Sequence, residues 1–126
     1  MKKILFVLTL SVTGSFAWAD SFTDISNAAR QQGSPASQYV NERLIPDVRK
    51  QLAAESSRCS WEADVKKTER FDVALELDED GAIVDSSVSP ETSMASCLRD
   101  SIREKHMPKP PKAPFFAVIP QVVAEP

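Results

Sequence analysis

The clearest pattern in the chain is a strict alternation of apolar and polar positions from Arg70 to Leu77. One face of this segment is apolar and consists of Phe71, Val73, Leu75 and Leu77, while the other consists of Asp72, Ala74 and Glu76. Successive side chains of a strand point to opposite faces of a sheet, so the pattern predicts a strand with one buried and one solvated face. The following Asp78-Glu79-Asp80-Gly81 predicts a tight turn with positive φ at the glycine, after which residues 82–88 return as a hairpin partner.

A helical period precedes the hairpin. Between Gln38 and Ser57 the apolar residues recur every four positions and share one helix face: Val40, Leu44, Val48 and Leu52. Pro46 interrupts the run, because it lacks a backbone N–H and clashes with the preceding turn. Two interpretations stay open: the helix kinks at Pro46, or a second helix begins there. Residues 58–68 predict a charged connector, in which Trp61 is expected in or over the core rather than as a binding hot spot.

A second helix and a last strand follow the hairpin. Ser89-Pro90-Glu91 indicates a helix start, with serine as the N-cap. The helix then carries an apolar stripe of Met94, Cys97, Leu98 and Ile102. Met107-Pro108-Lys109-Pro110-Pro111 stops the helix, and Phe115 to Val123 resumes as an extended apolar segment. Pro120 inside this segment cannot donate in a ladder, so we expect an edge strand.

The order helix, strand, strand, helix, strand predicts an α+β fold. A three-stranded antiparallel sheet packed against helices on one face is the simplest closure. We expect this domain to span residues 38–126. The polar segment 20–37 before it predicts at most a short helix over residues 22–30, followed by a break.

The N-terminal residues 1–19 have the features of a cleaved signal peptide. Two lysines precede an apolar run from Ile4 to Val12, and Ala17-Trp18-Ala19 is a small-x-small cleavage site. An uncleaved anchor is the less favoured alternative, since the run falls short of the ~20 residues of a spanning helix. We therefore expect an exported protein.

Charge and cysteine content narrow the function classes. The chain has 15 basic and 18 acidic residues, and loss of Lys2 and Lys3 with the signal makes it more acidic. This balance disfavours nucleic acid, whose phosphates require a basic face, and anionic lipid. Cys59 and Cys97 form an even pair in an exported chain, which indicates a disulfide. On the loop-entropy model such a bridge stabilises the fold by roughly 4 kcal/mol.

No combination of residues predicts catalysis. The only histidine, His106, stands beside the proline run, and the scarce glycines provide no phosphate-binding loop. The carboxylates of Asp78 and Asp80 belong to an exposed turn that lacks the later ligands of a calcium loop. We therefore expect a protein that is not an enzyme and that uses no cofactor and no metal.

Several features together resemble a known family. They are the hairpin FDVALELDEDGAIVDSSV, a helix with a cysteine four residues after Ser93, the segment MPKPP and the closing strand. From roughly Tyr39 to Val123 this layout resembles the C-terminal domain of TolA and, more distantly, TonB-like C-terminal domains. The resemblance implies a bridge from the helix cysteine Cys97 to Cys59 and a place in the Gram-negative periplasm. The chain differs from TolA in having a cleavable signal and almost no spacer. It therefore looks like a free copy of the binding domain.

The resemblance also implies protein binding by strand addition, in which a partner strand pairs with an exposed sheet edge. The expected site is the last strand: Phe115, Phe116, Ala117, Val118, Ile119, Gln121, Val122 and Val123. Strand alternation lets only one of the two phenylalanines point into the core, which leaves the other as an apolar anchor. The expected partners are envelope proteins of the Tol–Pal type, or phage or bacteriocin domains.

Two further function classes stay open. One is an inhibitor or immunity protein against a lysozyme-like enzyme or toxin, with the acidic turn from Asp78 to Asp80 facing a basic target. The other is a structural domain of a larger envelope assembly that has no discrete ligand.

Overall fold

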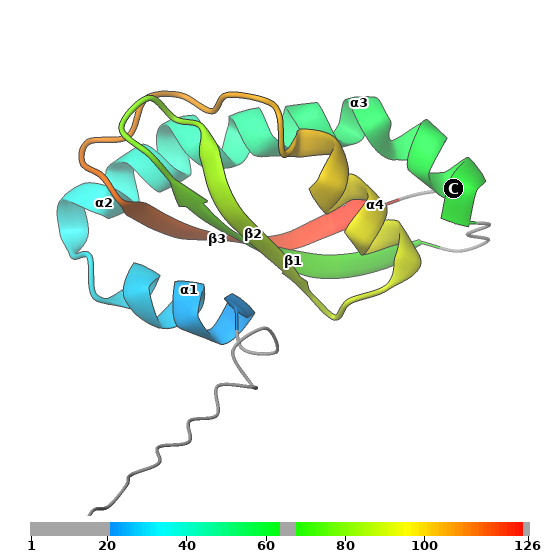
Figure 1. Cartoon of the computed structure of the whole chain (residues 1–126), viewed down its shortest axis with the longest axis horizontal. Helices are drawn as coiled ribbons and strands as arrows, with labels where there is room; N and C mark the ends of the chain where they lie inside the picture. Colours follow the sequence, from blue (N-terminus) through cyan, green and yellow to red (C-terminus); the bar gives the residue numbers. More distant parts are fainter. Residues whose placement is uncertain (1–20, 64–67, 125–126) are drawn as a thin grey trace, which may run out of the picture.

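A computed structural model of the chain describes residues 21–63 and 68–124 (Figure 1). The predicted signal peptide, residues 1–19, lies outside the described residues. The elements in chain order are α1 (Ser21–Arg30), α2 (Ser34–Tyr39), the π-helical turn η2 (Val40–Leu44), α3 (Ile45–Ala63), β1 (Glu69–Leu77), β2 (Ile83–Ser89), α4 (Ser93–Ile102) and β3 (Phe115–Ala124). The α+β class, the element order and the hairpin are as the sequence predicts.

The sheet has three antiparallel strands in the order β2-β1-β3, so β3 is an edge strand as its proline predicts. The register of β3 on β1 shifts once. Ile119 pairs with Val73 and Val122 with Phe71, so that two β3 residues, one of them Pro120, lie opposite Asp72 alone. This is the arrangement of a β-bulge, and it lets the strand accommodate a residue that has no N–H.

The main core lies between the sheet and the helices α3 and α4. The apolar face of β1 is buried throughout, and it packs with most of the two predicted helical stripes: Leu44 of η2, Val48 and Leu52 of α3, and Met94, Leu98 and Ile102 of α4. The remaining stripe residues, Val40 and Cys97, are half-buried against this cluster. Each such side chain stabilises the fold by about 1.5–3 kcal/mol relative to an exposed one. The helical and strand periods of the sequence therefore predict this core correctly.

The second face of the sheet is not simply solvated, because α1 lies across it on the side opposite α3 (Figure 1). Ala74, which alternates with the core residues of β1, is 0 % exposed, and Ile25 is the buried residue of α1. Neither belongs to the main core cluster. The expectation of helices on one face only is thus wrong. The small side chain of Ala74 leaves space on the central strand for a helix to approach.

The structure supports the second interpretation of Pro46, in which a helix segment begins with this proline in its first turn. The backbone stays helical through Val40 and Ile45, so that α2, η2 and α3 follow one another directly. The π-helical turn η2 ends just before α3, whose second residue is Pro46. A local change of helical hydrogen-bond spacing is a common way to absorb a residue that cannot donate.

Two local expectations are corrected. Trp61 is 87 % exposed, because α3 continues to Ala63 and two helical positions separate Trp61 from the buried Cys59 by about 200°. The N-cap of α4 is Thr92, whose hydroxyl accepts a hydrogen bond from the Ala95 N–H, and Ser89 is instead the last residue of β2. Within the described ranges no helix has the length and apolar character needed to cross a membrane.

Candidate functional site at the outer edge of β3

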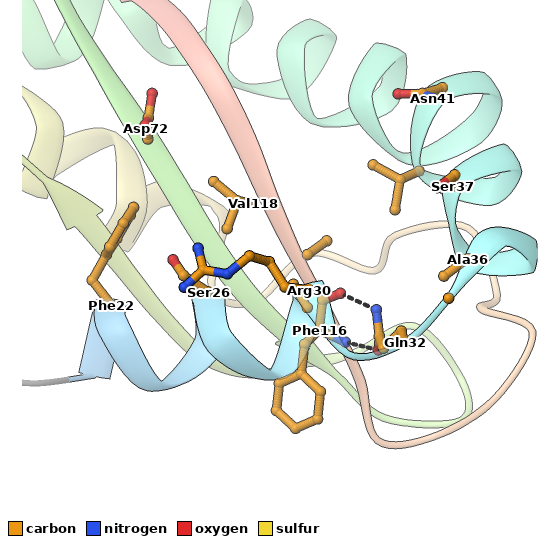
Figure 2. Close-up of a pocket in the computed structure, with 14 residues that line it drawn as sticks. Phe22, Ser26, Arg30, Gln32, Ala36, Ser37, Asn41, Asp72, Phe116 and Val118 are labelled. Atoms are coloured by element: carbon orange, nitrogen blue, oxygen red, sulfur yellow. Dashed lines mark hydrogen bonds between the residues drawn. The ribbon is translucent and has the colours of Figure 1, made fainter.

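A groove of about 450 Å³ runs along the outer edge of β3 (Figure 2). Helix α1 forms one wall, and α2 with η2 forms the other. The lining residues that matter most are Phe22 and Arg30 on the first wall, Ala36 and Asn41 on the second, and Phe116 and Val118 on the floor. The groove therefore contains part of the strand that the sequence predicts as the binding site.

The backbone of Phe116 faces this groove and is already paired. Its N–H donates to Oε1 of Gln32 at 2.7 Å, and its carbonyl accepts from Nε2 of the same side chain at 2.6 Å (Figure 2). Both backbone groups of Phe116 thus point away from β1. Gln32 occupies them as a residue of a neighbouring strand would.

The next outward position on β3 is Val118. In an antiparallel strand the direction of the backbone groups alternates along the chain, so Val118 presents its N–H and carbonyl on the same side as Phe116. In the part of the chain that the structure describes, no hydrogen bond reaches these outward groups. Beyond them, the Pro120 carbonyl accepts from Nη2 of Arg49 at 2.9 Å. Val118 is therefore an open position between two occupied ones.

The side chains of the predicted site divide between the core and the groove. Four of them are buried: Phe115, Ala117, Ile119 and Val122. Phe116 and Val118 are half-buried and line the groove, Val123 is 44 % exposed, and Gln121 follows Pro120 at the bulge. The expectation that one phenylalanine points inward is confirmed, with Phe115 in the core and Phe116 as the residue at the groove.

The groove offers polar and apolar surface, with Arg30 and Asp72 as charged side chains of its lining. The Arg30 guanidinium lies along its wall and donates to Oδ1 of Asn27. Over the described residues no three histidine, cysteine or carboxylate side chains approach one another closely enough to hold a metal ion. His106 is exposed, and its backbone forms a bridge with Ala82. Such a lining suits an extended polypeptide, whose N–H and C=O groups match an open strand edge.

Sequence reasoning missed the contribution of Gln32. A lone glutamine carries no signal of a contact 84 residues away. The one hint is Gly33 beside it, which adopts φ 89° and ψ −179°, a conformation accessible to glycine almost alone. This glycine lies between α1 and α2, and its backbone conformation lets the chain change direction before α2 begins.

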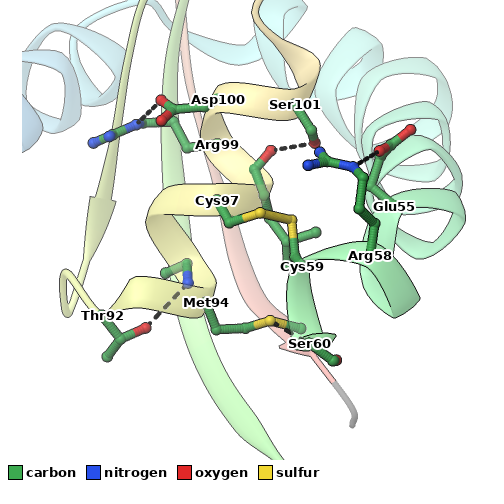
Figure 3. The surroundings of a disulfide bond; sticks show 12 residues. Glu55, Arg58, Cys59, Ser60, Thr92, Met94, Cys97, Arg99, Asp100 and Ser101 are labelled. Atoms are coloured by element: carbon green, nitrogen blue, oxygen red, sulfur yellow. Dashed lines mark hydrogen bonds and ion pairs between the residues drawn. A yellow bond between two sulfur atoms is a disulfide. The ribbon is translucent and has the colours of Figure 1, made fainter. Parts of the chain in front are cut away.

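The Cys59–Cys97 disulfide joins α3 to α4, with the two Cα atoms 5.6 Å apart (Figure 3). The predicted bridge is therefore present, and neither of the helices that it joins lines the groove. Beside it, Nε of Arg58 donates to Glu55 at 3.1 Å, and the Lys105 ammonium lies 3.6 Å from the same carboxylate. The Arg58 hydrogen bond, with Lys105 nearby, lowers the pKa of Glu55 below its ordinary value.

The acidic turn is well ordered by its own hydrogen bonds. Oδ1 of Asp78 accepts from the N–H groups of Asp80 and Ala82, both at 2.9 Å. The Gly81 carbonyl accepts from the Met107 N–H at 2.9 Å, which fixes the turn to the segment after α4. Glu79 and Asp80 remain exposed.

Comparisons with protein-family models, curated proteins and solved structures found no match. The groove, the open position at Val118 and the residues around them are therefore the basis for a functional proposal.

Proposed function

We propose that this protein is a non-enzymatic protein-binding domain of the periplasm, similar in its mode of action to the C-terminal domain of TolA. It binds an extended segment of an envelope partner in the groove between α1 and α2, by strand addition to β3. The observation that carries the proposal is the outward N–H and carbonyl of Val118, which lie at the floor of the groove without a partner among the described residues.

Physical chemistry favours a polypeptide in this position. Backbone groups that are shielded from water cost free energy until they are paired, and an added strand supplies both a donor and an acceptor. Each hydrogen bond contributes only about 0.5–1.5 kcal/mol net, so one open position makes a weak site without apolar contacts. Phe116 and Phe22, which both line the groove, supply these contacts. Tol–Pal type proteins, phage proteins and bacteriocin domains are the candidate partners.

The test uses two substitutions at one position. Val118→Pro removes the outward donor but leaves the β1–β3 ladder intact, because that N–H does not face β1. Val118→Thr keeps the N–H and nearly the same shape and is the matched control. In pull-downs from envelope extract, we expect the unmodified protein and the threonine variant to capture the same partner and the proline variant to lose it. Equal capture by all three, with circular dichroism showing that each is folded, would rule out strand addition at Val118.

A second candidate function, inhibition of a lysozyme-like enzyme or toxin, is favoured by the fixed acidic turn. Exposed carboxylates on a rigid turn complement a basic active-site cleft. The double variant Glu79→Lys/Asp80→Lys is expected to abolish inhibition in a lysozyme assay while leaving capture through β3 unchanged. If the unmodified protein does not inhibit, this candidate is eliminated and the first is unaffected.

A further inference from the structure

We infer that Gln32 is a latch, an intramolecular substitute for the partner strand that closes one position of the β3 edge and is released when α1 moves away. This inference rests on the proposed function, because it concerns how the same edge becomes available. It adds a closed and an open state to the groove and names the residue that separates them.

The geometry of Gln32 carries the first step. Its side-chain amide has the same donor and acceptor pair as a peptide group, and it bonds both outward groups of Phe116 at 2.7 and 2.6 Å. A partner strand that extends from Val118 to Phe116 needs these two groups. It must therefore displace Gln32, after which the edge offers two successive outward positions instead of one.

The attachment of α1 allows such a displacement. The helix has one buried side chain, Ile25, and this residue lies outside the main core cluster. At its far end, the Ser21 hydroxyl donates to Oδ2 of Asp85 at 3.2 Å in an exposed contact. Elements with few buried contacts open locally without unfolding the rest of a protein. Gly33, at positive φ, is the joint between this helix and α2.

The opposite edge of the sheet is protected in a different way. On β2, the Ser86 N–H donates to Oδ1 of Asp85 at 2.9 Å. Asp85 is the neighbour of Ser86 on the same strand, so it stays beside this N–H. A charged side chain at an edge also discourages pairing with another strand. Gln32 belongs to another element and is neutral. This contrast indicates that β3 is the edge that becomes available to a partner strand.

Binding is tested with a defined probe, a synthetic peptide of the β1 sequence ERFDVALEL, residues 69–77, which matches a strand neighbour of β3 in size and alternation. Gln32→Ala removes the latch, and Gln32→Glu keeps its length but loses the donor to the Phe116 carbonyl. Gly33→Ala disturbs the joint without touching Gln32. Gln31→Ala is the matched control, since Gln31 is exposed and its backbone N–H donates to the Ala28 carbonyl in the last turn of α1.

We expect the three opening variants to bind the peptide roughly fivefold to tenfold more tightly than the unmodified protein and the Gln31 control. Adding Val118→Pro to Gln32→Ala should remove the gain. Without peptide, the Phe116 amide should exchange its hydrogen faster in Gln32→Ala and Gly33→Ala but not in Gln32→Glu, whose carboxylate still accepts from this N–H, while the amides of β1 keep their protection in all variants.

The outcomes separate the latch from the proposed function. If the unmodified protein binds the peptide and the opening variants bind it equally or less tightly, the latch is wrong and strand addition stands. If no variant binds although all are folded, strand addition is wrong and the latch has no role. Faster exchange over the whole sheet in Gln32→Ala would show a purely structural residue and would also overturn the inference.

Discussion

The phenol of Tyr39 donates a hydrogen bond to the backbone carbonyl of Pro108, which joins α2 to the proline segment after α4. The ring also packs edge to face on Phe115, with centroids 4.9 Å apart and planes at 80°. One buried side chain thus connects three parts of the fold: the helix before the core, the proline segment and the last strand. Burial raises the pKa of Tyr39 to about 12.

This pKa predicts a loss of stability at alkaline pH. The unfolded chain ionises its tyrosine near pH 10, whereas the folded chain keeps the phenol protonated until about pH 12. The contribution is therefore fully present below pH 10 and is lost as the pH rises towards 12. Tyr39 is the single tyrosine of the chain, so tyrosinate absorbance reports it directly.

Tyr39→Phe is the control for this prediction. It should lower the free energy of unfolding at neutral pH by about 1 kcal/mol, the net value of the lost hydrogen bond, and remove the contribution of this group between pH 10 and 12. A phenol that titrates near pH 10 in the native protein would contradict the prediction.

Gly81→Ala is expected to destabilise the protein. Gly81 has φ 88°, and a Cβ added there would stand 2.2 Å from the Met107 carbonyl oxygen. Positive φ in a residue other than glycine costs roughly 1–3 kcal/mol, to which the steric conflict adds. Urea unfolding measures the loss. Asp80→Ala in the same turn should stay within about 0.5 kcal/mol, because only its backbone N–H takes part in the turn.

Periodicity accounts for most of the fold that sequence reasoning predicts. The alternation of β1 and the four-residue spacing of the helix before it are regular local patterns that extend over several apolar residues. They place the core correctly. Pro120 likewise identifies β3 as an edge strand. The expectation that Trp61 is buried is wrong because its placement depends on where α3 ends. The charged residues around it give no signal for the end of the helix. The predicted N-cap of α4 is wrong because serine and threonine both occur near the helix start and either can cap a helix.

Removal of the disulfide is expected to lower stability strongly while leaving the groove unchanged. The bridge connects α3 to α4, and the groove is lined by other elements. The double variant Cys59→Ser/Cys97→Ser should lose roughly 2–5 kcal/mol of unfolding free energy. The Phe116 amide should keep its hydrogen-exchange protection in the folded double variant. Selective loss of that protection would show that the bridge supports the groove after all.

Neighbouring positions of β1 should respond very differently to substitution. Leu75 belongs to the main core, so Leu75→Ala should cost about 2–5 kcal/mol of global stability. Ala74 is buried outside that core, on the face of the sheet that α1 covers, so the charge in Ala74→Asp should detach α1 instead of unfolding the domain. Hydrogen exchange distinguishes the two results: Ala74→Asp should deprotect residues 21–30 and leave β1 protected. Global unfolding by Ala74→Asp would mean that α1 is an integral part of the core.

Trp61 should be dispensable for stability. At 87 % exposure its emission is expected to resemble that of tryptophan in water and to change little on unfolding. Trp61→Ala should alter the free energy of unfolding by no more than about 0.5 kcal/mol. A large loss, or a strong emission shift on denaturation, would place the indole in a contact that the described residues do not contain.

Only part of the candidate site can be predicted from the sequence. The pattern from Phe115 to Val123 predicts the strand, its edge position and the division between its two phenylalanines. The closing of that edge by Gln32 and Arg49 cannot be read from the sequence, because both contacts join residues far apart in the chain, through two hydrogen bonds from Gln32 and one from Arg49. No period or motif encodes such a contact. What the sequence presents as one open strand is, in the structure, an edge occupied at Phe116 and Pro120, with Val118 open between them.

The disulfide has a consequence for how the domain bears mechanical load. The covalent ring that it closes contains β1 and β2, while β3 lies outside the ring. A pull on the C-terminal end of β3 is therefore resisted by its pairing with β1 and by side-chain contacts, without any covalent crosslink. Antiparallel pairs loaded from one end separate one after another, so β3 should peel away at low force. The ring then limits further extension, and the hairpin inside it stays available for β3 to pair again.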